Sequence, residues 1–191
     1  KQYQQFRAAP LNVDEGGSVF VVEAGMTGSA IIARLSRLGY SQDAWPWRVL
    51  LRLQPAVLQA GEYQLTPGIT PPEFLRMLAE GEVIRYRFTL VEGWTYRQVV
   101  DALYADPVLG DWLRENITEA SLRLAHSLLG PAEGCLLPET YVFTRSENAL
   151  QVLDRAADAM NAALTEAWEL RTPDHPVKSP YELLVLASII E

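Results

Sequence analysis

The first part of the chain alternates between apolar and polar residues in a way that predicts a small α+β unit. Residues 19–22 are a β-prone apolar run, and residues 61–65 alternate as in a short strand. Between these segments, apolar residues recur at helical spacing over residues 31–38 and again over residues 47–53. The predicted order is strand, helix, helix, strand, within a length that suits a small domain. The polar residues 1–17 indicate an irregular tether ahead of this unit.

The middle of the chain carries two strong helix-start signals on either side of a predicted strand. Residues 70–73, Thr-Pro-Pro-Glu, combine a cap, prolines in the first turn and a capping-box glutamate, and Gly81 is suited to end that helix. Residues 84–90 then alternate, so the even-numbered positions would face a core and the odd-numbered ones water. Thr95 and Gln98 form a second capping box.

The last part of the chain predicts a loop and strand followed by two helices. Residues 133–143 are a loop that leads into a strand, and residues 150–170 have the pattern of a long amphipathic helix. Ser179 to Glu182 is a clear helix start. Residues 183–190 are apolar on nearly every side, which predicts a helix buried all round. The fold class predicted from these elements is α+β.

Composition narrows the functional classes. The 191 residues are 49% hydrophobic and 21% charged, which is ordinary for a folded protein, and the net charge of −8 argues against a nucleic-acid partner. Cys135 is the single cysteine, so an intrachain disulfide is excluded. His126 and His175 lie far apart without ligand-like spacing, so we expect no metal and no cofactor. The longest uncharged apolar run, residues 183–190, is too short to span a membrane.

Glu191 is the first candidate for chemistry because it follows directly after that apolar stretch. Helical side chains lean toward the N-terminus, and the residues that precede Glu191 on its side of a helix, Ala187 and Ser188, are small enough to leave room for a ligand. Apolar surroundings raise the pKa of a carboxyl group, and a protonated glutamate is suited to act as a general acid. A solvated glutamate at a helix end has the same spacing, so both interpretations stay open.

The loop that starts at Glu133 is the second candidate. Gly134 and Pro138 constrain its backbone. Four side chains offer hydrogen-bond donors and acceptors suited to sugar hydroxyls: Glu133, Glu139, Thr140 and Tyr141. A loop of this kind is also common as scaffolding, and Cys135 within it is better interpreted as a small packed hydrophobe than as a nucleophile.

With these residues in view, the sequence resembles the YceG-like family of endolytic murein transglycosylases, the MltG type. The stretches that carry the resemblance are residues 60–70 continued by 73–81, residues 88–95, residues 133–141 and residues 186–191. The family more often has Asp at the position of Glu139. The resemblance makes Glu191 the counterpart of the family's catalytic glutamate and Glu133, Glu139, Thr140, Tyr141 and Ser188 candidates for substrate binding.

The resemblance also implies an organisation. It divides the chain into a juxtamembrane tether (1–17), a LysM-like βααβ module with the following helix (18–80), and the N-terminal part of a mixed α/β catalytic domain (81–191). It implies a bacterial inner-membrane protein with a single membrane-spanning helix before residue 1 and with this region in the periplasm. We therefore expect the chain to be a fragment of a longer protein.

The function that the resemblance implies is the cutting of peptidoglycan glycan strands by one glutamate. Glu191 would act first as an acid and then as a base, leaving a 1,6-anhydro end without metal or cofactor. A first alternative is a two-carboxylate muramidase in which Glu133 or Glu139 assists hydrolysis. A second is a peptidoglycan-binding scaffold for synthesis partners. In each case the expected partners are glycan strands and, as candidates, peptidoglycan synthases.

Overall fold

The computed structural model describes residues 2–42, 44–116, 134–172 and 176–190, and it confirms the α+β fold class. The chain separates into two compact units. The first comprises residues 1–86 together with Thr144–Ser146, and the second comprises Arg87–Phe143 and Glu147–Glu191. This division falls a few residues after the boundary at 80/81 expected from the sequence, because Val83, Ile84 and Tyr86 still contact the first unit.

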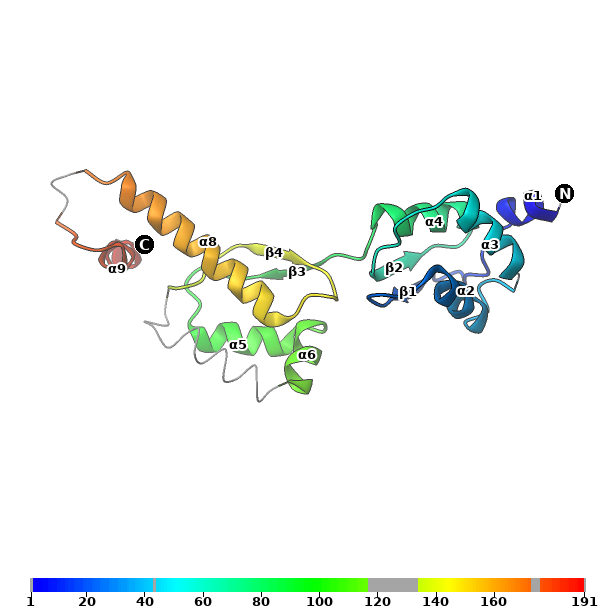
Figure 1. The fold of residues 1–191 in the computed structure, drawn as a ribbon. Helices are drawn as coiled ribbons and strands as arrows, with labels where there is room; N and C mark the ends of the chain where they lie inside the picture. Colours follow the sequence, from blue (N-terminus) through cyan, green and yellow to red (C-terminus); the bar gives the residue numbers. More distant parts are fainter. Residues whose placement is uncertain (1, 43, 117–133, 173–175, 191) are drawn as a thin grey trace. The chain divides into compact units, whose positions relative to one another are not determined.

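The first unit contains the predicted strand–helix–helix–strand order (Figure 1). Its elements are α1 (Gln2–Ala8), β1 (Ser18–Val22), α2 (Gly28–Arg37), α3 (Ala44–Leu53), β2 (Gly61–Leu65) and α4 (Pro71–Glu80). Strands β1 and β2 pair antiparallel, with Phe20 opposite Tyr63. Helix α4 begins at the predicted Thr70 cap and ends at Gly81, whose φ of +67° is the left-handed conformation that glycine adopts without strain.

Aromatic side chains fill the centre of the first unit. Phe74 on α4 meets Phe20 on β1 edge-on at 5.3 Å between ring centroids, and it meets Trp47 on α3 at 6.0 Å. Tyr63 is fully buried, and its hydroxyl donates a hydrogen bond to the carbonyl oxygen of Gln59 at 2.7 Å. Edge-to-face rings add to the hydrophobic burial of each side chain, so one aromatic cluster joins α3 and α4 to the sheet.

The N-terminal segment differs from the irregular tether expected from the sequence. Residues 2–8 form α1, and Phe6 and Leu11 are buried in the core of the first unit. Phe6 packs edge-on against Trp47 at 5.3 Å, and the Leu11 amide donates to the carbonyl oxygen of Ile69 at 2.8 Å. Two apolar residues five positions apart give no recognisable helical period, so this docking was not visible in the sequence.

A buried carboxylate lies at the edge of the first unit. Glu62 on β2 is only 8% exposed, and its side chain accepts a hydrogen bond from the Tyr86 hydroxyl at 2.7 Å. Arg145 forms an ion pair with the same carboxylate at 3.3 Å. The hydrogen bond to Glu62, followed by burial, raises the pKa of Tyr86. Burying a carboxylate without partners would cost free energy. The Tyr86 hydroxyl and the Arg145 guanidinium offset this cost at Glu62.

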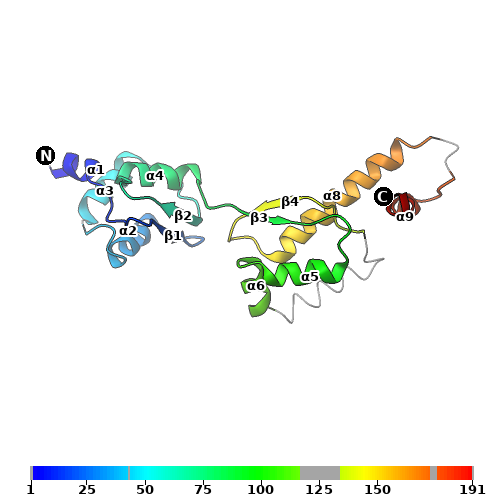
Figure 2. The same cartoon turned by 180° about the vertical axis from the view of Figure 1, so that it is seen from behind.

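The second unit packs helices against the paired strands β3 and β4 (Figure 2). Its elements are β3 (Tyr86–Thr89), α5 (Tyr96–Ala105), α6 (Leu109–Glu115), β4 (Thr140–Phe143), α8 (Ala149–Glu169) and α9 (Pro180–Ile190). Phe88 and Leu90 are buried whereas Arg87 and Thr89 are exposed, which confirms the alternation predicted for residues 84–90. In both ribbon views α8 runs along the strand pair, and Phe143, Val152 and Ala156 are almost fully buried.

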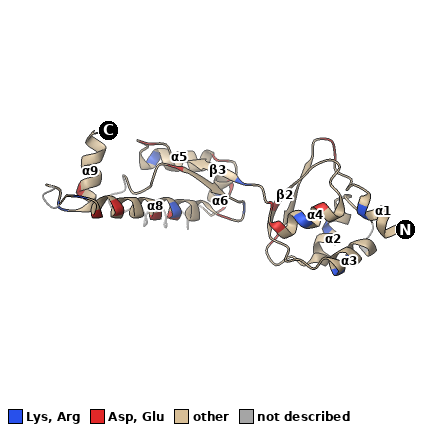
Figure 3. Ribbon diagram, turned by 90° about the horizontal axis from the view of Figure 1, so that it is seen from above, with Lys and Arg blue, Asp and Glu red and all other residues tan. Residues whose placement is uncertain are grey.

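Helix α9 contradicts the prediction that residues 183–190 are buried all round. None of its residues is buried, and Ile189 and Ile190 are 75% and 78% exposed. Figure 3 shows the helix as almost entirely uncharged, with Glu182 in its first turn. The sequence pattern reports how apolar a helix is, but burial also requires elements that cover it. Among the described ranges, no helix has both the length and the apolar character that a membrane span requires.

Candidate functional site

A cavity of about 450 Å³ lies within the second unit, at the meeting of four segments. These segments are the turn after β3 with the start of α5, the loop before β4, the middle of α8, and α9. Its lining residues are Leu90, Val91, Glu92, Gly93, Trp94, Tyr96, Val99, Gly134, Cys135, Leu136, Pro138, Met160, Leu184, Ala187 and Ser188. The size is within the range of small-ligand sites, and an apolar wall with a few polar groups is typical of them.

Backbone hydrogen bonds hold the loop of residues 134–138 in place. The Leu90 amide donates to the carbonyl oxygen of Glu139 at 3.0 Å, which extends the pairing of β3 with β4. The Leu137 amide donates to the carbonyl oxygen of Ala156 at 3.1 Å, which ties the loop to α8. The wall of the cavity is therefore anchored at one end by the strands and in its middle by a helix.

Gly134 allows α9 to approach this loop. Its φ is +83°, a conformation that residues with a Cβ rarely adopt. A Cβ at this position would also lie 3.1 Å from Cδ2 of Leu184 on α9. The glycine expected from the sequence to constrain the loop thus also sets how closely the helix packs.

The turn between β3 and α5 supplies the most polar part of the lining. The Trp94 amide donates to the carbonyl oxygen of Val91 at 3.3 Å, and the predicted Thr95–Gln98 capping box is present, with the Thr95 amide donating to Oε1 of Gln98 at 2.8 Å. This turn presents Glu92 and Trp94 at the cavity, followed by Tyr96. Burial, followed by the neighbouring Tyr104, raises the pKa of Tyr96, so its phenol stays protonated at neutral pH.

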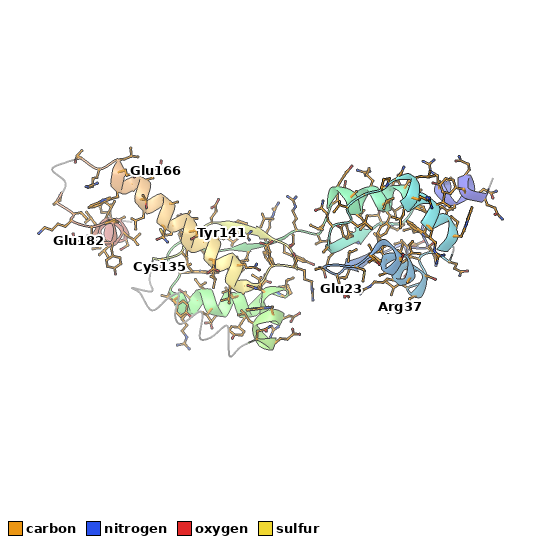
Figure 4. The ribbon with its side chains drawn as sticks, viewed as in Figure 1. Glu23, Arg37, Cys135, Tyr141, Glu166 and Glu182 are labelled. Carbon is orange, nitrogen blue, oxygen red and sulfur yellow. The ribbon has the colours of Figure 1, made fainter. Side chains whose placement is uncertain are left out.

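Of the site residues predicted from the sequence, one on α9 lines the cavity and two lie outside the described residues. Ser188 and Ala187 both line the cavity, and the Ser188 hydroxyl donates to the carbonyl oxygen of Val185 at 2.8 Å. Glu191 and Glu133 lie outside the described residues. Cys135, labelled in Figure 4, is half-buried in the cavity wall.

The other three predicted binding residues lie beside the cavity and are absent from its lining. Glu139 is exposed and joins β3 through its backbone, while Oγ1 of Thr140 is 2.9 Å from Oγ1 of Thr89. Tyr141 is buried on β4, and its hydroxyl donates to the carbonyl oxygen of Leu137 at 2.8 Å. Burial, with a further contribution from Glu139, raises the pKa of Tyr141. These residues hold the loop that forms the cavity wall.

Of the polar and aromatic lining residues, Glu92, Trp94 and Tyr96 were not among the site residues predicted from the sequence. Among the described lining residues, Glu92 is the one with a charged side chain. Their signal in the sequence was the stretch of residues 88–95, which contributes to the family resemblance and contains the Glu-Gly-Trp turn directly before the Thr95 cap. A turn that precedes a capped helix fixes the direction of its side chains, and loops of this kind often carry functional groups.

Metal-binding groups do not gather anywhere in the part of the chain that the structure describes. No group of three or more His, Cys, Asp or Glu side chains is placed there to hold an ion. His126 and His175 lie outside the described residues. The chemistry that the described cavity can offer is therefore a carboxylate, a phenol, a hydroxyl, a thiol and an indole ring.

Comparison with known proteins identifies the family. Among solved structures, the chain is similar to a yceG-like protein from Listeria monocytogenes at 19% sequence identity and a TM-score of 0.37, with 82% of this chain and 57% of that chain covered. The chain thus spans little more than half the length of that protein. No match is found among curated proteins. The family model described as the YceG-like family matches residues 20–191, nearly the whole chain, and the chain therefore belongs to the YceG-like family.

Proposed function

We propose that the protein is an endolytic lytic transglycosylase that cuts the bond between N-acetylmuramic acid and N-acetylglucosamine inside peptidoglycan strands. The observation that carries the proposal is that the family match runs to Glu191 while the residues three and four positions before it, Ser188 and Ala187, line the cavity. That combination supports a catalytic glutamate working at this cavity. The loop of residues 134–138 and the turn at Glu92 and Trp94 supply walls for the sugar.

The proposed reaction needs one carboxyl group. Protonated Glu191 donates its proton to the glycosidic oxygen as the bond from that oxygen to C1 of the muramoyl sugar breaks. The C6 hydroxyl of the same sugar then forms a bond to C1, and the Glu191 carboxylate takes the hydroxyl proton. The enzyme ends in its starting protonation state, no water is consumed, and the products are a 1,6-anhydro end and a free 4-hydroxyl. General acid–base catalysis of this kind contributes about 10²–10⁴-fold in rate.

The cavity supplies groups that suit an amino-sugar substrate. Trp94 offers a flat apolar surface for a sugar ring, and the aromatic ring of Tyr96 also lines the cavity. The Ser188 hydroxyl on α9 also lines the cavity. Apolar neighbours such as Met160 complete the wall around these groups.

The proposed setting follows from the family. Residues 18–65, with their βααβ order, would serve as a LysM-like module, and residues 81–191 as the first part of the catalytic domain. A membrane-spanning helix preceding this region would hold it on the periplasmic side of the bacterial inner membrane. Glycan strands would be its substrate and peptidoglycan synthases its candidate partners.

The experiment is a digest of purified murein by the full-length protein, with products identified by mass spectrometry. We expect anhydro-ended fragments from the wild type and a loss of about 10²–10⁴-fold with Glu191→Gln. Glu166→Gln, an exposed change on α8, is the matched control and should retain full activity. Anhydro products at an undiminished rate from Glu191→Gln would refute the role of this residue.

A two-carboxylate muramidase remains the second candidate because the described lining contains one carboxylate, Glu92. In that mechanism Glu92 joins Glu133 and Glu139 as a candidate to orient a water molecule for hydrolysis. Reducing ends among the products, lost in Glu92→Gln, would favour it. An absence of any products with retained murein binding would instead favour the scaffold function.

A further inference from the structure

One side of helix α3 in the first unit is both apolar and basic, and it is open to solvent. We call it the α3 face, and it consists of Trp45, Arg48, Val49, Arg52 and Leu53. At the usual rotation of an α-helix, these five positions fall within an arc of about 140°. Trp45 and Leu53 are 62% and 64% exposed, both arginines are exposed, and Val49 is half-buried.

The opposite side of α3 fixes the helix in the core, so the α3 face stays turned toward solvent. Trp47 is almost fully buried and packs edge-on against Phe6 and Phe74. Its indole Nε1 also donates a hydrogen bond to the Ser41 hydroxyl at 2.9 Å. A helix held in this way cannot turn Trp45 inward. Single exposed hydrophobic residues are common, but a cluster on one helix face marks an interaction surface.

The charge of this surface is opposite to that of the whole chain. The chain has 24 acidic and 16 basic residues, yet residues 44–61 contain Arg48 and Arg52 and no acidic residue. Figure 3 accordingly shows no red on α3. Asp43, directly before the helix, lies outside the described residues. Neither arginine forms an ion pair within the described part of the chain, so both charges are available to an anionic partner.

These features select among kinds of partner. Tryptophan is favoured where a membrane meets water, and arginine can lay its methylene groups on an apolar surface while its guanidinium reaches a phosphate. An anionic lipid surface therefore satisfies the indole, the aliphatic side chains and the two charges together. A protein partner would need a pocket for Trp45 and acidic groups placed opposite both arginines, whereas lipids rearrange to suit the side chains that they meet.

We propose that the α3 face binds the surface of a membrane that contains anionic phospholipids. Trp45 and Leu53 enter the boundary between the headgroups and the acyl chains, and Arg48 and Arg52 contact lipid phosphates. Two cations and a few apolar side chains give a weak, reversible attachment, which holds the first unit at the lipid surface. The proposal goes beyond the proposed function and needs no assumption about the reaction.

The test is co-sedimentation of the 191-residue chain with vesicles of phosphatidylglycerol, compared with vesicles of neutral phosphatidylcholine. We expect binding to phosphatidylglycerol that weakens as salt is added, and little binding to phosphatidylcholine. Arg48→Gln combined with Arg52→Gln should lower the partition constant about 25-fold, because each arginine near an anionic surface contributes about fivefold. Arg85→Gln combined with Arg87→Gln removes two charges from exposed positions outside α3, and this matched control should bind nearly as wild type.

The apolar part of the α3 face has its own readout. Phosphatidylglycerol with brominated acyl chains should quench the tryptophan emission of the wild type, and Trp45→Phe should remove most of that quenching. Leu53→Ala should weaken binding because less apolar surface enters the lipid. Leu170→Ala, an exposed change after α8, is its matched control and should leave binding unchanged.

Several outcomes would overturn the proposal. Equal losses in the two double-arginine variants would show that net charge, rather than the α3 face, drives binding. Equal binding to both kinds of vesicle, abolished by Ile189→Ser, would assign it to the exposed apolar helix α9. Binding of a soluble polyglutamate peptide that depends on Arg48, without binding to phosphatidylglycerol, would assign the surface to an acidic protein partner.

Discussion

At the scale of single residues, Tyr141 acts on the candidate site through the loop that it holds. We expect Tyr141→Phe to lower the free energy of unfolding by about 1 kcal/mol, because the carbonyl of Leu137, a half-buried residue, loses its hydrogen bond from the buried Tyr141. Denaturant unfolding measures this change. Tyr181→Phe, at an exposed position on α9, is the control and should leave stability unchanged.

Murein kinetics distinguish a positioning role for Tyr141 from direct contact with the sugar. A residue that holds the loop should lower kcat modestly, in parallel with the loss of stability, and leave KM nearly unchanged. A large rise in KM with unchanged stability would instead indicate that the phenol contacts substrate, as the sequence had suggested. The buried hydroxyl and its bond to Leu137 favour the first outcome.

Gly134 gives a second test at this scale, with Gly93 as its matched control. Both glycines line the cavity with positive φ, +83° and +74°, so alanine should strain either backbone by about 1–2 kcal/mol. Only at Gly134 would the new Cβ meet Leu184, at 3.1 Å, whereas Gly93 faces open space. We therefore expect Gly134→Ala to cost about 1 kcal/mol more in unfolding experiments. Equal losses of unfolding free energy in the two variants would show that α9 shifts away from a Cβ at residue 134 without an energetic cost.

At the scale of elements, two helices begin with the same capping box but respond differently to pH. At the start of α4, the Glu73 carboxylate accepts from the Thr70 amide at 2.8 Å and from its hydroxyl at 2.7 Å, and these bonds lower the pKa of Glu73 below 4.5. At the start of α5, neutral Gln98 accepts the equivalent bonds from Thr95. Only the first box contains a group that titrates.

The sign of the pH effect follows from the lowered pKa. The folded state binds a proton at Glu73 less readily than the unfolded state does, so the bonds stabilise α4 fully above about pH 4.5 and are lost as the pH falls through the folded pKa. Glu73→Gln should remove this acid-sensitive contribution from the first unit, and Gln98→Glu should introduce one in the second. Thermal unfolding between pH 3 and pH 7 measures both. A pH profile unchanged by Glu73→Gln would contradict the assignment.

Signals contained within a few neighbouring residues were predictable from the sequence. The Thr70 and Thr95 caps, the end of α4 at Gly81 and the alternation around Phe88 are each set by local backbone chemistry, and all are confirmed. The burial of Phe6 was not predictable, because it depends on Trp47, a partner far along the chain. Local pattern fixes an element, whereas docking depends on contacts that the pattern does not contain.

The residues of the candidate site also differ in whether local sequence was enough to predict them. Ser188 could be named from helical spacing alone, because its position depends on one element. Glu139 could not be excluded from the cavity by spacing, since the direction of its side chain depends on the pairing of Leu90 with this segment. Glu92 was not predicted as a site residue because its turn and the loop of residues 134–138 are far apart in the sequence. The two segments line one cavity only in the folded unit.

At the scale of the whole molecule, the two units have separate hydrophobic cores. Leu50 belongs to a core cluster drawn entirely from residues 3–83, whereas Leu103 is fully buried in the second unit. Truncating a buried leucine to alanine lowers the free energy of unfolding by about 2–5 kcal/mol. The decrease applies to the cooperative unit that contains the leucine. The division of the chain therefore predicts two separable unfolding reactions.

Hydrogen exchange measured by mass spectrometry, peptide by peptide, tests this prediction. Leu50→Ala should speed exchange in β1, α2, α3 and β2 while α8 keeps its wild-type protection, and Leu103→Ala should do the reverse. Leu53→Ala, an exposed change on the same helix as Leu50, should alter neither pattern. Exchange that rises equally in both units after either core change would mean that they unfold as one.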